Sequence, residues 1–260
     1  MISAVFAARR SEGRATLVPY FTAGHPDADS TATVLSALTD AGADVIELGI
    51  PFSDPLADGP TIQKSSFESL KSGTTVARVL RDLSVFREAH QTPVVLFTYL
   101  NPVLRYGIDG FLSDAVEAGA NGLLLTDLPT GADPELEAKV VASQLDLIRL
   151  IAPTTQLNRV RQVSEGGSGF VYYISRTGVT GARQELRGEL HDEIRAIQGT
   201  VDLPVAVGFG ISTPEQAAAV GDVADGVVVG SALVQRLGAE GVDAGAAFVR
   251  SLREGLDSGR

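Results

Sequence analysis

AGADVIELGIPFSDPLADGPTIQ, residues 41–63, places a short apolar segment directly before a loop rich in proline, glycine and aspartate. The segment VIELGI, residues 45–50, is too short and too β-branched for a helix, so it predicts a buried strand. The loop that follows, SDPLADGP, is rigid and too short to be a linker between domains. We therefore expect this strand and loop to position functional side chains.

Glu47 is the charged residue of this strand, and an ionised carboxylate there is costly unless it is paired or protonated. It could end the strand in solvent or pair with an arginine, because structural ion pairs also perturb pKa values. Asp58 follows in the loop, in a different environment. Two titratable groups in unlike surroundings are typical of sites that divide acid and base roles. We therefore predict Glu47 and Asp58 as the catalytic carboxylates.

Apolar segments alternate with helical patterns along the chain, as expected of a parallel sheet that is buried on both faces. Four strands share a small-residue entry: AGADVIEL (41–48), AGANGLLL (118–125), GGSGFVYY (166–173) and VADGVVVG (223–230). Strands are expected within 15–27, 45–50, 93–102, 120–129, 145–153, 168–183, 203–213 and 224–234. Helices are expected at 2–10, 29–40, 61–90 with a break at Gly73, 108–119, after Pro134, 155–165, 186–198, from 214, and 242–256.

This alternation predicts an α/β fold, a (β/α)8 TIM barrel, with residues 1–260 forming a single domain that carries extra N-terminal and C-terminal helices. A doubly wound open sheet is the alternative. Its G-x-G-x-x-G fingerprint would have to follow an early strand. The nearest match, at residues 208–213, lies far downstream and lacks the third glycine.

In a barrel the chemistry lies at the carboxyl ends of the strands. Glycine-rich turns follow the last two strands, GFGIS (208–212) and GSAL (230–233). Glycine lets the backbone approach an anion closely, and a serine beside a helix N-terminus adds a hydroxyl. These glycines could be simple turn residues, but their place on adjacent strands predicts a phosphate site. That site comprises Gly210, Gly230 and Ser231, with a further amide from Gly181.

Composition excludes several classes of function. The 260 residues contain no cysteine, which rules out disulfides and thiolate metal sites. Their 21 basic and 32 acidic residues give a net charge of −11, which argues against nucleic acid and anionic membranes as partners. No apolar run reaches the roughly 18 residues that span a bilayer, and MISAVFAARRSEGR has no signal-type apolar region. A cytoplasmic enzyme is expected.

The inventory of reactive residues narrows the chemistry. The lysines Lys64, Lys71 and Lys139 all fall in helical patterns, so no strand-end lysine is available for a Schiff base. The three histidines show no spacing typical of a metal site, and none is predicted. Carboxylate acid–base catalysis without a cofactor remains.

The phrases VPYFTAGHPD, VIELGIPFSDPLADGPTIQ, FTYLNPV, GLLLTDLP, YYISRTGVTGA, GFGIST and VVVGSALV resemble the tryptophan synthase alpha chain family. They are spread over residues 17–234 in the order of the family, and ELGIPFSDPLADGP is long and specific. The resemblance implies a carbon–carbon lyase of tryptophan biosynthesis. Such an enzyme cleaves indole-3-glycerol phosphate to indole and D-glyceraldehyde 3-phosphate.

By this resemblance Glu47 and Asp58 match the catalytic carboxylates of the family, and the glycines and serine named above match its phosphate site. Tyr172 and Thr180 would lie near the substrate, and Phe209 and Phe97 would pack against the indole ring. Core packing is the alternative for the three aromatic residues. SRTGVTGAR, residues 175–183, resembles the family's lid, which we expect to be poorly ordered without ligand.

The resemblance also implies a partner, a beta chain that joins indole with serine by means of pyridoxal phosphate in an α2β2 heterotetramer. No cofactor is expected on this chain itself. The surface that meets beta would include Pro51, Asp54, Asn101 and Pro129, although these loops could be ordinary barrel connections.

Three other functions remain open. One is a stand-alone indole-3-glycerol-phosphate lyase that releases free indole. Another is a different phosphate-binding barrel, such as an isomerase or indole-glycerol-phosphate synthase. The third is a barrel that only activates beta. Indole release measured with and without the beta chain separates these functions. The sequence predicts neither the activity of the isolated chain, nor its affinity for beta, nor its pathway context.

Overall fold

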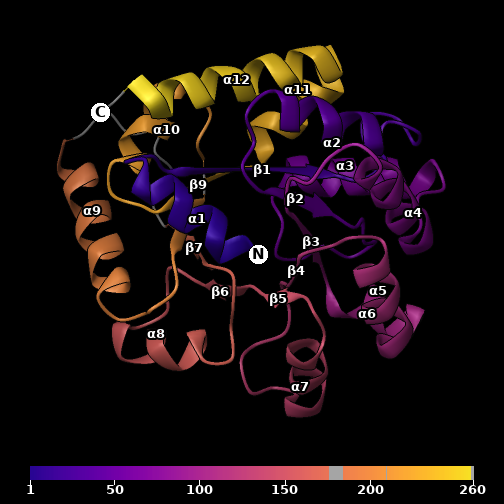
Figure 1. The fold of residues 1–260 in the computed structure, drawn as a ribbon, viewed down its shortest axis with the longest axis horizontal. Coiled ribbons are helices and arrows are strands. Elements are labelled where there is room, and N and C mark those ends of the chain that lie inside the picture. Colours follow the sequence, from indigo (N-terminus) through magenta and orange to yellow (C-terminus); the bar gives the residue numbers. More distant parts are fainter. Residues whose placement is uncertain (176–183, 209, 259–260) are drawn as a thin grey trace.

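The computed structural model describes residues 1–175, 184–208 and 210–258, with the backbone alone for 184–189. Nine strand segments form one parallel sheet in the order β5-β4-β3-β2-β1-β9-β8-β7-β6 (Figure 1). The strands are β1 Thr16–Thr22, β2 Ile46–Gly49, β3 Val94–Thr98, β4 Gly122–Leu125, β5 Asp146–Leu147, β6 Arg149–Ile151, β7 Val171–Ile174, β8 Val205–Gly208 and β9 Gly226–Val229.

The two ends of this order, β5 and β6, are consecutive in the chain and are separated by Ile148 alone. They are two halves of one strand: β5 pairs with β4, and β6 pairs with β7. The sheet therefore closes through this strand into an eight-stranded barrel, and the predicted (β/α)8 fold is confirmed.

Helices surround the barrel and alternate with its strands (Figure 1). They are α1 Ile2–Ser11, α2 Thr31–Asp40, α3 Pro60–Lys71, α4 Val76–Arg87, α5 Leu100–Tyr106, α6 Ile108–Glu117, α7 Pro134–Ala142, α8 Leu157–Ser164, α9 Gln184–Gln198, α10 Pro214–Gly221, α11 Ser231–Glu240 and α12 Val242–Ser258. The extra terminal helices expected from the sequence are α1 and α12.

Most expected helix boundaries agree within two residues. Gly73 separates α3 from α4 with a φ of +86°, and Thr75 caps α4 by accepting a hydrogen bond from the Arg78 amide at 3.2 Å. One helix, α5, was not expected. Ser30 precedes α2, but its hydroxyl donates to the Asp27 carbonyl at 2.7 Å and does not cap the helix.

Helix α1 closes the amino-terminal end of the barrel, which faces the viewer in Figure 1. Its Ile2 and Phe6 are buried, and the Phe6 ring stacks on Phe170 at 5.2 Å. Because Gly122 and Gly226 have no side chains, they leave room for Ile2 and Phe6, which plug this end of the barrel. A Cβ on Gly226 would lie 2.7 Å from Phe6. The plug packs under one layer of inward side chains: Val18, Val45, Val95, Leu124, Ile148, Phe170, Ala206 and Val228.

Because successive side chains of a strand alternate between its faces, the next inward residue on each strand lies two positions further on. On the first three strands these residues are Tyr20, Glu47 and Phe97. The sheet register places Tyr20 directly opposite Glu47. The barrel thus has a packed floor, and one layer above it the first three strands carry larger side chains, two of them polar.

Candidate active site

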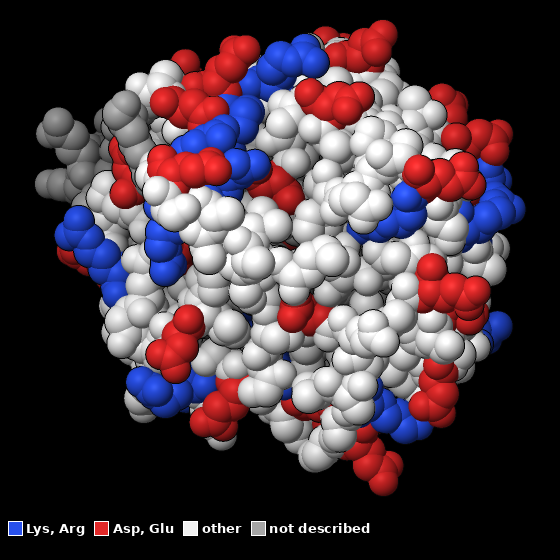
Figure 2. All heavy atoms as spheres, viewed as in Figure 1, with Lys and Arg blue, Asp and Glu red and all other residues white. Residues whose placement is uncertain are grey.

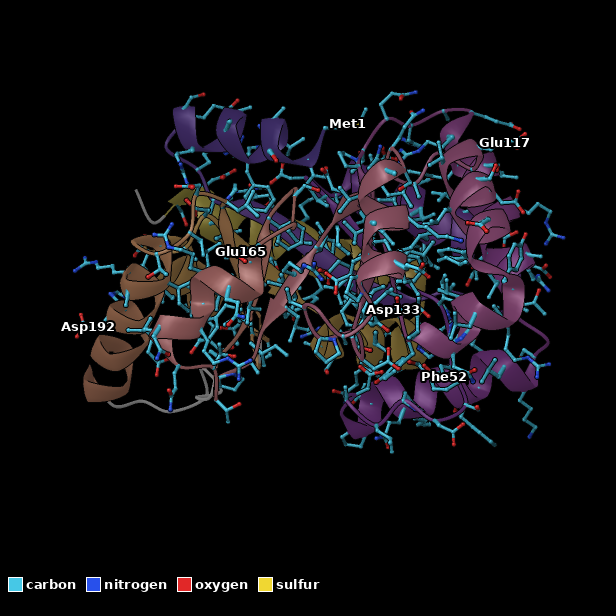
Figure 3. The ribbon with its side chains drawn as sticks, turned by 90° about the horizontal axis from the view of Figure 1, so that it is seen from below. Met1, Phe52, Glu117, Asp133, Glu165 and Asp192 are labelled. Atoms are coloured by element: carbon cyan, nitrogen blue, oxygen red, sulfur yellow. The ribbon has the colours of Figure 1, made fainter. Side chains whose placement is uncertain are left out.

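A cavity of about 570 Å³ opens above this floor, at the carboxyl ends of the strands. The side-on view of Figure 3 places Met1 and α1 at one end of the barrel and Phe52, in the loop after β2, at the other. The cavity is lined by Tyr20, Glu47, Ala57, Asp58, Gly59, Pro60, Ile62, Phe97, Thr126, Leu150, Tyr172, Ile174, Gly210, Ile211, Ser212, Val228, Gly230, Ser231, Ala232 and Gln235.

Glu47 reaches the cavity from β2 with only 1% of its surface exposed. Its Oε1 atom is buried and has no hydrogen-bond partner among the described residues. Burial disfavours the ionised form and raises the pKa of Glu47 to about 8. This carboxyl group therefore holds its proton at neutral pH and is able to donate it, as an acid catalyst must.

Asp58 lies in the loop between β2 and α3 and is only half-buried. The Tyr99 hydroxyl donates a hydrogen bond to its Oδ2 atom at 3.0 Å and accepts one from the Ala57 amide at 3.0 Å. Burial raises the pKa of Asp58 to about 6, and the hydrogen bond from Tyr99 opposes this rise. Asp58 is thus ionised at neutral pH while Glu47 is protonated.

Another part of the cavity wall is formed by the turns after β8 and β9. Gly210 has a φ of +71°, a conformation that favours glycine, and Gly230 precedes the first residue of α11, Ser231. The first amides of a helix have no acceptor within it, so those of α11 can bind an anion. None of the described residues that line the cavity is a lysine, arginine or histidine, so among them an anion would be bound by amides and hydroxyls.

A further part of the cavity wall is apolar. Phe97 contacts Tyr20 edge-to-face at 5.2 Å between ring centroids, and both rings line the cavity. Leu150, Ile174 and Val228 continue the wall. The cavity therefore combines two glycine turns, an apolar wall and two carboxyl groups, of which one is neutral and the other ionised at neutral pH.

The structure brings together most of the residues predicted from the sequence. Glu47, Asp58, Phe97, Tyr172, Gly210, Gly230 and Ser231 all line the cavity. Thr180, Gly181 and Phe209 lie outside the described residues, as does most of the predicted lid. Of the predicted partner-facing residues, Asp54, Asn101 and Pro129 are exposed and Pro51 is buried.

Sequence reasoning missed Tyr20, Ser212 and Gln235, which also line the cavity. Tyr20 could have been predicted from the sequence, because every second residue of the first strand faces inward and Tyr20 is one of them. Asp127, near the mouth, does not line the cavity. Its Oδ1 accepts a hydrogen bond from the Leu100 amide at 2.7 Å and so holds two loops together.

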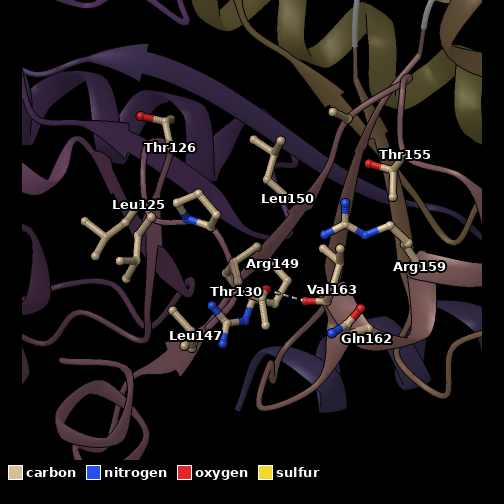
Figure 4. A pocket seen from close by; sticks show the side chains of 14 residues that line it. Leu125, Thr126, Thr130, Leu147, Arg149, Leu150, Thr155, Arg159, Gln162 and Val163 are labelled. Carbon is tan, nitrogen blue, oxygen red and sulfur yellow. Dashed lines mark hydrogen bonds between the residues drawn. The ribbon is translucent and has the colours of Figure 1, made fainter. Parts of the chain in front are cut away.

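A second pocket, of about 270 Å³, lies beside the first and shares Thr126 and Leu150 with it (Figure 4). Its charged lining residues are Arg149, which pairs with Glu137, and Arg159, and none of the described residues that line it carries a carboxylate. Thr130 closes one side by donating a hydrogen bond to the Val163 carbonyl at 2.8 Å. Without an acid or a base this pocket cannot carry the predicted chemistry.

Other classes of site gain no support from the described part of the chain. Within it, no three His, Asp or Glu side chains are grouped so that they could hold a metal ion. None of the described helices combines the length and apolarity that a membrane crossing requires. On the face drawn in Figure 2, acidic and basic side chains are interspersed around the periphery.

Comparisons with known proteins agree on one family. The family model "Tryptophan synthase alpha chain" matches residues 6–255. The tryptophan synthase alpha chain of a Geobacter species is 48% identical over 262 residues, covering 99% of this chain and 98% of that relative. That of Synechococcus elongatus is 47% identical over 257 residues, covering 98% of this chain and 97% of that relative.

Solved structures give the same answer. The tryptophan synthase subunit alpha of Legionella pneumophila superposes with a TM-score of 0.91 at 36% identity, and each chain is covered to 98%. The aminoacrylate-bound tryptophan synthase of M. tuberculosis matches with a TM-score of 0.89 at 35% identity, again with 98% of each chain covered.

Proposed function

Since the chain belongs to the tryptophan synthase alpha chain family, we propose that it cleaves indole-3-glycerol phosphate to indole and D-glyceraldehyde 3-phosphate. Members of this family are lyases of tryptophan biosynthesis. The observation that carries the proposal is the composition of one cavity. Glu47 and Asp58, whose pKa values of about 8 and about 6 favour a protonated and an ionised carboxyl group at neutral pH, line the same cavity as Gly210, Gly230 and Ser231.

The reaction is a retro-aldol cleavage. The Glu47 carboxyl group gives its proton to carbon 3 of the indole ring, and the resulting carboxylate takes the proton of the neighbouring glycerol hydroxyl. The carbon–carbon bond then breaks as that oxygen becomes the carbonyl of glyceraldehyde 3-phosphate. Glu47 ends protonated, as it began. Ionised Asp58 accepts a hydrogen bond from the indole N–H and stabilises the positive charge that develops on the ring.

The remaining lining residues bind the substrate. Phe97 and Tyr172 contact the indole ring, and the amides of the α11 terminus hold the phosphate together with Ser231. Each hydrogen bond to a charged group contributes about 1.5–3 kcal/mol, so a few of them fix one end of the substrate firmly. Thr180, Gly181 and Phe209 keep the substrate-binding roles assigned from the sequence.

We further propose that the indole passes to a beta chain, which carries the pyridoxal phosphate, within an α2β2 assembly. This chain itself uses no cofactor. The surface that meets beta consists of loops at the barrel mouth with Asp54, Asn101 and Pro129. Leu56, in the same loop as Asp54, is 90% exposed, which is consistent with a contact surface. Pro51 is buried and shapes the base of this loop.

The test is release of indole from indole-3-glycerol phosphate by the purified chain, with and without beta. Slow release that beta accelerates supports a partnered alpha chain, whereas fast release by the chain alone indicates a stand-alone lyase. A chain that activates beta but leaves the substrate intact would contradict the proposed reaction.

Variants test the assigned roles. General acid–base groups contribute roughly 10²–10⁴-fold, so Glu47→Gln and Asp58→Asn should each lower kcat at least about a hundredfold. Asp109→Asn is the matched control, because Asp109 is exposed on α6 and pairs with Lys139. Near-normal indole release by either active-site variant would refute its role.

A further inference from the structure

Within the described part of the chain, no hydrogen-bond donor is in place for the Oε1 atom of Glu47. That atom is buried without a partner, and none of the described residues that line the cavity is basic. An ionised carboxylate in such a place is strongly disfavoured unless donors solvate it. A group that shuttles a proton must nevertheless become ionised in every turnover. The glycerol hydroxyl that Glu47 deprotonates donates to one oxygen of the carboxylate, which leaves the other oxygen to a donor from the protein.

In the part of the chain that the structure describes, the titratable groups around Glu47 come from four elements. They are Tyr20 on β1, Asp58 in the loop after β2, Tyr99 next to the end of β3 and Tyr172 on β7. Asp58 is an acceptor when it is ionised, and the Tyr99 hydroxyl already donates to it. The two phenols that interact electrostatically with Glu47 are those of Tyr20 and Tyr172.

Packing fixes the ring of Tyr20 beside Glu47. The two residues are register partners on adjacent parallel strands, so their side chains emerge on the same face. The Tyr20 ring is held edge-to-face by Phe97. Its hydroxyl lies over Gly49, where a Cβ would be only 2.3 Å from the phenolic oxygen. Because Gly49 has no side chain, the Tyr20 hydroxyl fits closely against β2, the strand that carries Glu47.

A chain of buried hydroxyls determines which way the hydrogens of this group point. Ser65 donates to the Ile62 carbonyl at 2.9 Å, because a carbonyl can only accept. The hydroxyls of Thr22 and Ser65 are 2.7 Å apart, so Thr22 is the donor to Ser65. Thr22 can then only accept from Tyr20, and their oxygens are 3.5 Å apart, beyond the usual range for two hydroxyls. The hydrogen bond from the Tyr20 hydroxyl to Thr22 is therefore weak.

We propose that Tyr20 is a positioning residue that donates a hydrogen bond to the Glu47 carboxylate each time Glu47 gives up its proton. The inference rests on the proposed function, in which Glu47 shuttles that proton. Tyr20 and Glu47 are not hydrogen-bonded in this structure, and rotation of the Glu47 side chain within the cavity joins them. While Glu47 is protonated, the phenol keeps its weak bond to Thr22.

The test compares two conservative variants that should act in opposite directions. Tyr20→Phe removes the donor and should raise the pKa of the Glu47 carboxyl group. Thr22→Val removes the acceptor that competes for the Tyr20 proton and should lower that pKa. In the Tyr20→Phe background, Thr22→Val should have no further effect, because both changes act through one hydrogen bond. Tyr106→Phe, a tyrosine of α5 that pairs with Asp114, is the control.

The measurement is a carbon-13 NMR titration of labelled glutamate carboxyl groups, with the Glu47 signal assigned by its absence in Glu47→Gln. We expect a rise of about one pH unit in Tyr20→Phe, as for the loss of one hydrogen bond to a charged group. An unchanged Glu47 titration in Tyr20→Phe, or shifts of the same sign in both variants, would overturn the proposal. The titration needs no substrate, so its outcome is independent of whether indole-3-glycerol phosphate is cleaved.

Kinetics provide a second readout. Tyr20→Phe should lower kcat roughly tenfold and leave KM within about twofold, because the hydrogen bond forms only when Glu47 is ionised during turnover. Circular dichroism and thermal unfolding establish that each variant is folded. A rise in KM with kcat unchanged would show that Tyr20 only binds substrate, and would overturn the positioning role.

Discussion

Tyr99 and Asp58 are joined by a hydrogen bond of 3.0 Å that connects the end of strand β3 to the loop after β2. The same hydroxyl accepts from the Ala57 amide, so one phenol holds both the loop backbone and its carboxylate. Asp58 is therefore presented to the cavity by a residue 41 positions away in the chain. The charge state of Asp58, in the loop after β2, therefore depends on a hydrogen bond from a residue at the end of β3.

The first prediction concerns that contact. Tyr99→Phe should raise the pKa of Asp58 above about 6, because the hydrogen bond that favours the carboxylate is lost while burial remains. The acidic limb of the pH profile of kcat/KM should move upward. Activity at neutral pH should fall several-fold and recover partly at higher pH. An acidic limb that stays in place would show that Tyr99 acts only on the loop conformation.

The second prediction concerns the wild-type pH profile. The proposed mechanism requires ionised Asp58 and protonated Glu47. Because the pKa values are about 6 for Asp58 and about 8 for Glu47, kcat/KM should rise with pH through about 6 and fall through about 8. A profile that continues to rise above pH 9 would contradict the role of Glu47 as the acid.

The third prediction concerns stability. Unfolded Glu47 loses its proton near 4.5, whereas the folded protein keeps it until about pH 8. Between these values the unfolded state binds fewer protons, so the free energy of unfolding falls as pH rises. Glutamine does not titrate. Glu47→Gln should therefore gain roughly 3–5 kcal/mol over wild type between pH 5 and pH 9.

Urea denaturation at the two pH values measures this difference. Glu117→Gln, at an exposed position of α6, is the control and should show no such trend. Equal stability differences at both pH values would mean that Glu47 is not protonated in the folded protein.

The fourth prediction concerns the anion end. A Cβ on Gly230 would have its nearest contact at 3.5 Å, from the Tyr20 ring, so the fold should accept Gly230→Ala. The new methyl group would occupy cavity space where the backbone must approach the phosphate. KM for indole-3-glycerol phosphate should rise about tenfold or more, with the melting temperature unchanged. Gly110→Ala on α6, where the nearest contact is at 4.0 Å, should change neither.

The sequence predicted what local patterns encode. Glu47 was found because a charge in an apolar strand is conspicuous, and Gly230 and Ser231 because a glycine turn precedes a helix. Helix α5 was missed because the strand was expected to extend over residues 93–102, although Pro102 fits the first turn of a helix and Gly107, with a φ of +96°, ends this one.

The hydrogen-bond partners could not be predicted in the same way. Tyr99 meets Asp58, and Tyr20 faces Glu47, only because the barrel sets particular strands side by side in a particular register. Strand adjacency is a tertiary property. A pattern along one strand reveals which side chains point inward but not which residue they will face.

The pairing of β1 with β9 has a consequence for synthesis on the ribosome. Thr16 pairs with Gly226, so one edge of β1, the first strand to be synthesised, stays unpaired until β9, the last strand, has been synthesised. Loop closure over such a separation is slow, and an unpaired edge invites aggregation. The nascent chain must keep β1 protected until translation is nearly complete, which makes the closing seam the step at which a chaperone would be of most use.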